Sequence, residues 1–204
     1  MLCHSLYKPL WSHAVMTHVA EEGNPRKGGM THAEINQSVL DVESWFKKHA
    51  RGCLDNAEGA QDSDIQALEK TMDTTIPEEL RSILTIQDGQ LWFSEKQALT
   101  CKAMVATAFK MEGRVPGWRA GLIPFAKDVD DNFLVTDTQA RGCPVAEWDA
   151  ADGEGGTVAK TFSLFLEGFR NELLAGRCEY VEGLGVVEKI TKKNVSSPPR
   201  SNRK

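Results

Sequence analysis

The sequence lacks several features that define whole classes of protein. No apolar run approaches the roughly 20 residues that a helix needs to span a bilayer, so we expect no membrane span. The five cysteines are odd in number and include no C-x-x-C pair, which favours reduced thiols and a cytoplasmic location over a disulfide framework. There is no histidine after His49, so a catalytic pair of Cys143 with a histidine would have to form between distant parts of the chain.

Positive charge is scarce in the central part of the sequence. Residues 62–176 contain 19 acidic and 11 basic residues, whereas residues 177–204 contain 7 basic and 3 acidic residues. An acidic body repels phosphate backbones, so we expect no nucleic-acid binding by the domain itself. A protein partner with a basic or mixed surface fits this charge distribution better.

The length of 204 residues fits one domain with a sizeable core. We predict a disordered or loosely ordered extension over 1–30, a domain over 31–190 and a disordered basic tail over 191–204. The first 20 residues contain one lysine and no acidic residue, as organelle targeting segments do, but the first arginine is Arg26. A targeting segment therefore stays an alternative to a plain extension.

Helix signals dominate the first half of the predicted domain. Three capping boxes predict three helix starts, because each pairs a hydroxyl residue with a Glu or Gln three positions later. The pairs are Thr31 with Glu34, Ser63 with Gln66, and Thr75 with Glu78. A further helix is predicted over 95–111, with Phe109 facing inward. Apolar residues at helical spacing from Phe162 predict a last helix that ends at Gly176.

Strand signals follow in the second half. Residues 121–126, 132–136 and 144–148 read as strands, and the apolar run 91–93 reads as a short edge strand. The glycine-rich segment 149–157 reads as a loop. Closely spaced strands favour antiparallel pairing. We therefore predict an α+β domain with a mixed, mostly antiparallel β-sheet flanked by helices.

Four segments in order carry a resemblance to a known family. They are Ile76–Leu84 followed by Asp88-Gly89, then Leu122–Ala126, then Asp131–Asp137, and finally Pro144–Asp149 followed by Ala159–Leu166. Together they resemble the SMI1/KNR4 (SUKH) family over about 62–176. Asp130 stands where that family has a glycine before the acidic residue, which is a departure from its pattern.

The resemblance implies a mixed α/β fold whose members bind other proteins. Bacterial relatives are toxin-neutralising immunity proteins, fungal relatives are regulatory scaffolds, and an animal relative is a subunit of a tubulin polyglutamylase complex. No enzymatic activity is established for the family. We therefore expect a non-catalytic protein-binding module, a scaffold or a regulatory subunit, without a cofactor. The alternatives are an immunity-type protein and an enzyme with a cryptic acidic or thiol site.

The expected partner-binding surface combines the loop after Asp88-Gly89, the region of Trp118 and the acidic turn. Tryptophan is favoured at binding hot spots, although core packing is an alternative for each one. The candidate residues are Asp88, Gly89, Trp92, Trp118, Asp128, Asp130 and Asp131. The oligomeric state stays open.

The same region offers two chemical alternatives, a metal site and a reactive thiol. Asp128, Asp130, Asp131 and Asp137 offer oxygen ligands, but the segment lacks the central glycine and terminal glutamate of a calcium loop. We therefore expect no metal. Cys143 begins a predicted strand without a nearby histidine, so an unreactive thiol is expected.

Overall fold

The computed structural model describes residues 29–55 and 58–189, so the tail predicted over 191–204 and all but the last two residues of the extension predicted over 1–30 lie outside the described residues. Helices and strands follow one another in the order α2 (His32–His49), α3 (Asp62–Met72), α4 (Glu78–Ile86), β1 (Trp92–Phe93), β2 (Lys96–Ala98), α5 (Cys101–Met111), β3 (Leu122–Lys127), β4 (Phe133–Asp137), β5 (Val145–Asp149), β6 (Gly153–Ala159), α6 (Phe162–Leu174), β7 (Cys178–Val181) and β8 (Gly185–Glu188).

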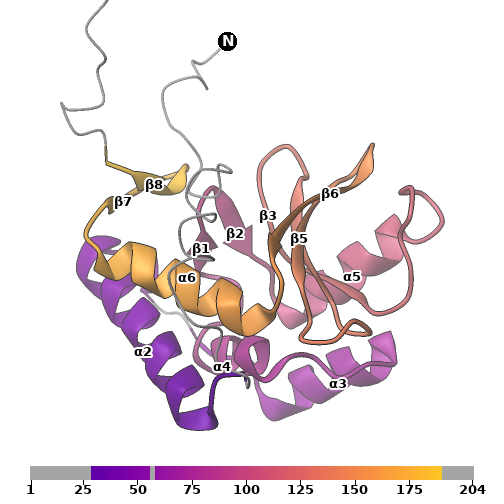
Figure 1. Ribbon diagram of the computed structural model, residues 1–204, viewed down its shortest axis with the longest axis horizontal. Helices are drawn as coiled ribbons and strands as arrows, with labels where there is room; N and C mark the ends of the chain where they lie inside the picture. Colours follow the sequence, from indigo (N-terminus) through magenta and orange to yellow (C-terminus); the bar gives the residue numbers. More distant parts are fainter. Residues whose placement is uncertain (1–28, 56–57, 190–204) are drawn as a thin grey trace, which may run out of the picture.

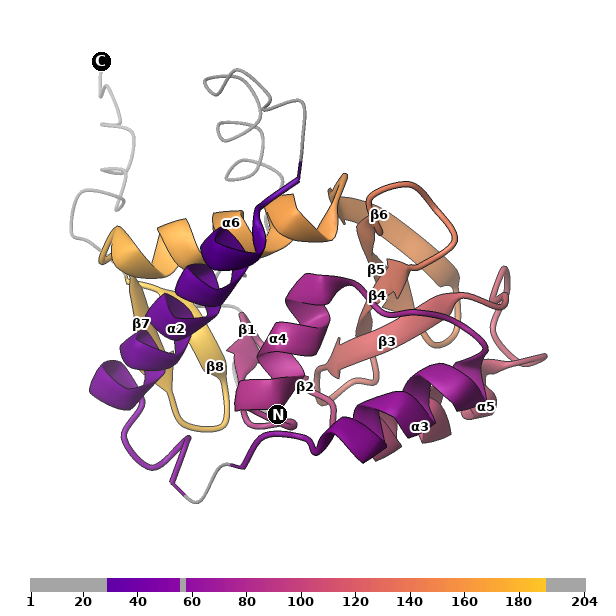
Figure 2. The same cartoon turned by 90° about the horizontal axis from the view of Figure 1, so that it is seen from below.

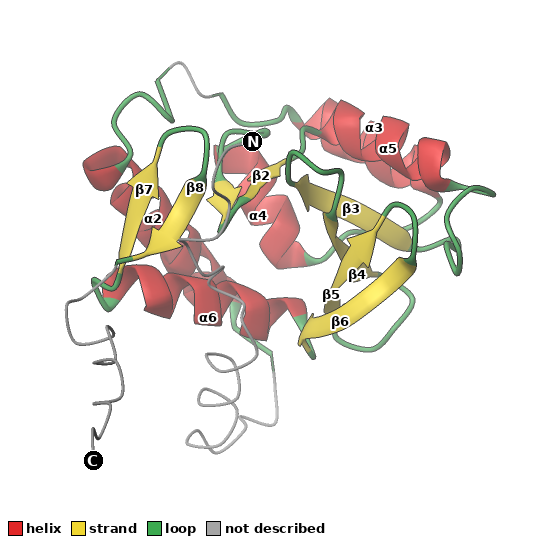
Figure 3. Ribbon diagram, turned by 90° about the horizontal axis from the view of Figure 1, so that it is seen from above, coloured by secondary structure: helices red, strands yellow, loops and turns green. Residues whose placement is uncertain are grey.

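One curled sheet organises the domain (Figures 1 and 3). Its six strands lie in chain order from β1 to β6, and every neighbouring pair is antiparallel. Strands β7 and β8 form a separate hairpin, which reaches β1 through a hydrogen bond from Val186 N to Ser94 O of 3.0 Å. The predicted α+β class is confirmed.

The main core lies between one face of the sheet and the helices. Helix α6 crosses this face, and α2 and α4 pack beside it (Figure 2). Phe125 of β3 is the centre of an aromatic cluster, with ring centroids 5.1 Å from Phe162, 5.5 Å from Phe165 and 5.7 Å from Phe93. Phe169 joins the cluster through Phe93, and all five rings are buried. The stripe predicted for the last helix is therefore confirmed.

A smaller core lies on the opposite face of the sheet. Its sheet residues are Leu122, Phe133, Val135 and Trp148, which come from β3, β4 and β5. Met111 and Val115, at and after the end of α5, cover one end of this face, and Trp118 packs edge-on against Trp148 at 5.3 Å. The rest of this face is not covered by a helix of the described chain.

One of the three predicted capping boxes is present. Glu34 N donates to Thr31 Oγ1 at 3.3 Å and Thr31 N donates to Glu34 Oε2 at 2.8 Å. The boxes at Ser63 and Thr75 are wrong, since α3 and α4 begin at Asp62 and Glu78 without a side-chain cap.

A contact with α3 anchors the segment in front of α4. The Glu69 carboxylate, on α3, accepts from Ile76 N at 3.0 Å and from Arg81 at 2.5 Å. These contacts hold the segment before the N-cap residue Pro77 against α3, while the first N–H groups of α4 have no side-chain cap.

Two further sequence predictions are wrong in part. The helix predicted over 95–111 begins only at Cys101, where Thr100 caps it, and residues 96–98 form β2 instead. Phe109 is 54% exposed, so it does not face inward. The predicted glycine-rich loop contains most of β6, because glycine allows close approach: a Cβ on Gly155 would lie 3.2 Å from Glu147 O.

Lys96 of β2 is a buried cation that contacts carboxylates from the β1–β2 turn, the β3–β4 turn and β5. Its side chain is 4% exposed, and its Nζ lies 2.5 Å from Glu95, 3.4 Å from Asp128 and 4.0 Å from Glu147. Burial alone would lower the pKa of Lys96, but the three carboxylates, Glu95 foremost, outweigh burial and raise it. The ammonium therefore stays charged in the folded protein.

Replacing this cation should destabilise the domain. We expect Lys96→Met to lower the free energy of unfolding by about 3 kcal/mol, because the mutation leaves the carboxylates uncompensated. The matched control Lys127→Met removes an exposed ion pair with Asp131 and should cost less than about 1 kcal/mol.

The two variants can be compared by urea unfolding followed by tryptophan fluorescence. A raised pKa contributes stability that is complete below the usual lysine pKa and is lost as the pH rises through the folded-state value. The loss in Lys96→Met should therefore be constant between pH 6 and 9. Equal losses in both variants would contradict this role of Lys96.

Candidate functional site

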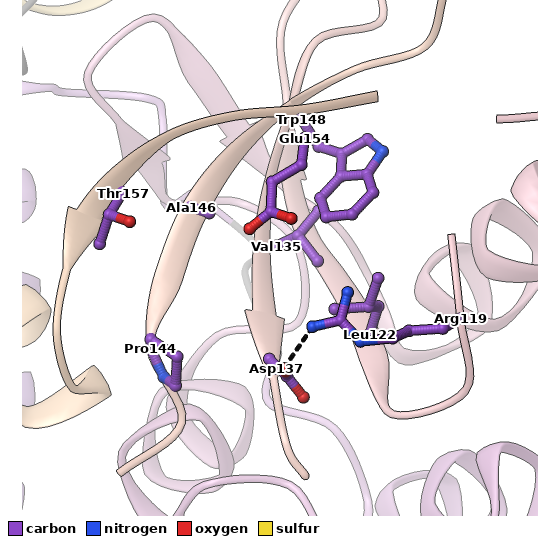
Figure 4. Close-up of a pocket in the computed structure, with 9 residues that line it drawn as sticks. All are labelled: Arg119, Leu122, Val135, Asp137, Pro144, Ala146, Trp148, Glu154 and Thr157. Atoms are coloured by element: carbon purple, nitrogen blue, oxygen red, sulfur yellow. Dashed lines mark hydrogen bonds and ion pairs between the residues drawn. The ribbon is translucent and has the colours of Figure 1, made fainter. Parts of the chain in front are cut away.

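The face of the sheet opposite α6 contains a small cleft of about 70 Å³ beside the buried residues of the smaller core (Figure 4). Its lining comes from β3 to β6 and from the segment before β3: Arg119, Leu122, Val135, Asp137, Pro144, Ala146, Trp148, Glu154 and Thr157. The cleft therefore lies opposite the face that α6 covers.

Polar groups stand at both ends of this cleft, and apolar residues form its floor. At one end Arg119 donates to Asp137 Oδ2 at 2.6 Å. At the other end Glu154 lies beside Trp148, its partner in the β5–β6 register. Val135 and Ala146, which are also register partners, lie between the two ends. The arrangement combines a neutralised ion pair with one carboxylate whose charge is not balanced by a side chain of the described residues.

The volume of the cleft limits what it can hold. Pockets for drug-sized ligands and cofactors usually measure about 300–1,000 Å³. A space of about 70 Å³ accommodates a few water molecules or part of one side chain. The cleft is therefore suited to a side chain of another protein rather than to a cofactor.

The acidic turn between β3 and β4 contains carboxylates with different roles. Asp128 Oδ1 accepts from the backbone N–H groups of Asp130 and Asn132, both at 2.9 Å, so this carboxylate holds the turn together. Asp131 has a left-handed backbone, with φ of 60°, and pairs with Lys127 at 2.9 Å. Asp130 is exposed, and its carboxylate forms no ion pair with another described residue. Asp130 is thus the carboxylate most accessible to a partner.

The loop after α4 uses its polar groups to position α5. Asp88 Oδ1 accepts from Cys101 N, the first residue of α5, at 2.8 Å. Gly89 is buried with φ of 100°, and a Cβ there would lie 2.7 Å from Thr100 Cγ2. Trp92 is half-buried and packs edge-on against Tyr180 at 6.5 Å. These three residues have clear packing roles in the fold.

The candidate residues from the sequence fall into two groups. Asp88 lies at the start of α5, whereas Asp131 is close enough to Lys110, near the end of α5, to feel its charge. The helix rise of 1.5 Å per residue separates these ends by about 14 Å. Trp118 belongs with the acidic turn, because it packs on Trp148, the register partner of Phe133. The structure therefore brings Trp118 close to the turn, whereas Asp88 lies at the start of α5 and Gly89 O accepts from Gln97, the register partner of Lys127.

The two chemical alternatives gain no support from the geometry. No group of three or more His, Cys, Asp or Glu side chains within 29–55 and 58–189 is placed to hold a metal. Asp137 lies at the far end of β4 from the acidic turn and pairs with Arg119. Burial raises the pKa of the Cys143 thiol, and the carboxylates of Glu79 and Asp137 raise it further. At neutral pH this thiol is protonated and a weak nucleophile.

Sequence reasoning missed several residues of the cleft. Glu154 lies in the segment that was predicted to be a loop, and Arg119 lies in a segment without a predicted role. The alternation of Ala146 and Trp148 along β5 was a usable signal, because alternate residues of a strand share one face. It would have placed both residues on a face separate from Val145.

The architecture defines an α+β domain with a curled antiparallel sheet, one face covered by helices and the other hollowed by a cleft. The sequence model of the SMI1 / KNR4 family (SUKH-1) matches residues 59–168, more than half of the chain. The chain therefore belongs to the SMI1/KNR4 family, as the four sequence segments predicted. The matched range contains the whole six-stranded sheet. A comparison with curated proteins gave no match. In the described residues no helix is both long and apolar enough to cross a membrane.

The acidic turn should contribute to stability in a pH-dependent way. The hydrogen bond from Lys127 lowers the pKa of Asp131, against a smaller opposing effect of burial. A lowered pKa adds stability above the unfolded value of about 3.9, and this stability is lost as the pH falls through the folded-state pKa. Asp131→Asn keeps a side chain that tolerates the left-handed backbone and removes the titration.

We therefore expect the melting temperature of Asp131→Asn to fall less than that of the wild type between pH 5 and 3. Lys127→Gln, which removes the donor, should flatten the same pH profile. Melting curves followed by circular dichroism would measure both effects. Parallel profiles for the wild type and Asp131→Asn would show that the Lys127 contact does not bias this carboxylate.

Proposed function

We propose that this chain is a non-catalytic protein-binding domain that acts in the cytoplasm as a scaffold or as a regulatory subunit of a larger complex. The observation that carries the proposal is the cleft on the uncovered sheet face, which is too small for a cofactor and holds the Glu154 carboxylate. A surface of this kind can receive a side chain from a partner.

The charges around the cleft indicate the chemistry of the partner. The hairpin of β5 and β6, residues 145–159, contains four acidic residues and no lysine or arginine. The exposed Asp130 adds negative charge at the β3–β4 turn on the same sheet. A partner with a basic or mixed surface would be attracted and oriented by this field.

A second candidate function is favoured by the family itself, which includes immunity-type proteins. In that case the partner would be a toxin, and binding would inhibit the activity of the toxin at one-to-one stoichiometry. The two functions can be separated by what binding does to the partner, because a scaffold leaves the activity of its partner intact or directs it.

Charge reversal at the acidic turn tests the proposal in the native cell. We would cross-link the full-length chain mildly, purify it by affinity and quantify the proteins recovered with it by mass spectrometry. The test variant is Asp130→Lys with Asp131→Asn, which avoids placing a lysine in the left-handed position. We expect a stoichiometric partner with the wild type and at least a fivefold lower yield with the variant.

The matched control is Glu167→Lys with Glu179→Gln, which makes the same change in charge at exposed positions of α6 and β7. It should recover the partner at the wild-type yield. Equal losses in both variants would indicate a nonspecific charge effect. Recovery of the chain alone, without any stoichiometric protein, would count against a binding function.

A further inference from the structure

The sheet has two edges, and only one of them is open. Strand β1 lies beside the β7–β8 hairpin, which contacts the β1–β2 turn through Val186 and Ser94. A Cβ on Gly185 would lie 2.2 Å from Ser94 O, so this approach is close. Strand β6 is the last strand at the other edge, and no described strand pairs with its outer side (Figure 3). Its outer backbone groups are therefore not used by any strand of the described residues.

The edge formed by β6 lacks some of the usual protective features, although Glu154 points into the cleft and the β5–β6 pairing contains two register shifts. Proteins usually block an exposed edge with lysine, proline, or inward-pointing charge, or keep the strand very short. β6 has seven residues, contains neither lysine nor proline, and exposes Glu154, Gly155, Gly156 and Thr157. The two glycines carry no side chains that would hinder another strand. A long, open and glycine-rich edge fits recognition by strand addition.

The cleft lies directly beside this edge. Glu154 and Thr157 belong to β6 and also line the cleft, because they are the register partners of Trp148 and Ala146. An extended chain paired with β6 would direct every second side chain to the same face of the sheet. One such side chain would lie next to the Glu154 carboxylate and the apolar floor of the cleft (Figure 4).

We propose that the outer edge of β6 binds an extended segment of a partner protein as an added antiparallel or parallel strand, with a lysine or arginine side chain of that segment in the cleft beside Glu154. The inference rests on the proposed protein-binding function and names the element of the partner that is recognised. Charge complementarity supports this occupant, because the β5–β6 hairpin is acidic throughout and Arg119 is already neutralised by Asp137.

A second copy of this chain is a less suitable occupant. Pairing β6 with β6 of another molecule would bring together two hairpins that each have four acidic residues and no basic residue. Like charges opposite each other in neighbouring strands destabilise the pair. The same field attracts a basic segment.

A library of displayed random ten-residue peptides would test the proposal on the full-length chain. We expect enriched peptides to contain a lysine or arginine within an alternating strand-like pattern. The best peptide would then be synthesised with single N-methyl groups along its backbone. Strand addition predicts that N-methylation weakens binding more than tenfold at every second residue and little at the residues between, because only alternate N–H groups face β6.

The role of the cleft is tested by removing one charge from the domain and one from the peptide. Glu154→Gln should weaken the peptide about tenfold, and replacing the peptide lysine or arginine by norleucine should do the same. Combined, the two changes should cost little more than either alone, since they remove one interaction. The matched control Asp152→Asn changes the same charge at an exposed position in the adjoining turn and should leave affinity within twofold.

The alternative outcomes are distinguishable. One outcome is that peptide binding fails in the variant Asp130→Lys with Asp131→Asn and persists in Glu154→Gln. That result would support the protein-binding function and overturn the β6 site. A uniform response to N-methylation, or no enriched peptide, would overturn strand addition even if a folded partner is recovered from cells. A chain that sediments as a dimer and binds peptide only on dissociation would assign the edge to a second copy.

Discussion

The burial of five phenylalanine rings between α6 and the sheet is the interaction on which the rest of the structure depends. Phe93 and Phe125 come from β1 and β3, and Phe162, Phe165 and Phe169 come from α6. Each fully buried ring contributes about 2 kcal/mol, so the cluster contributes on the order of 10 kcal/mol, similar to the net stability of a whole domain. This cluster determines which face of the sheet is covered.

The position of α6 also determines which face of the sheet carries the smaller core and the cleft. The sheet curls with α6 on one side, and the chain after α5 covers only one end of the other side through Val115 and Trp118. Gly153 makes this partial cover possible, because a Cβ there would lie 2.4 Å from Pro116 O. Beyond this contact the cleft lies over Ala146, whose small side chain leaves space unfilled on this face of the sheet. The cleft is therefore a result of how the smaller core ends, and its position is fixed by the backbone.

The parts of the fold that could be predicted from sequence are those with strong local signals. The stripe of α6, the box at Thr31 and strands β3 to β5 each depend on patterns of neighbouring residues. The start of α4 could not be predicted from a capping box, because α4 begins without a side-chain cap and Glu69 of α3 holds the preceding residue Ile76 instead. Strand β6 was missed because glycine is rare in strands, although at Gly155 it eases the close approach to Glu147 O. Without β6, neither the open edge nor the cleft could be inferred from sequence.

The acidic residues show why composition alone locates a binding surface poorly. The carboxylates of Asp88, Asp128 and Asp137 accept hydrogen bonds from α5, from the β3–β4 turn and from Arg119 respectively, so their charge is used within the fold. Asp130 and Glu154 are exposed and form no ion pair with another described residue. Counting acidic residues treats both groups alike, although only the second can exchange water for a partner without losing an internal contact. Substitutions in the second group can therefore change recognition while the first group keeps the sheet and its turns in place.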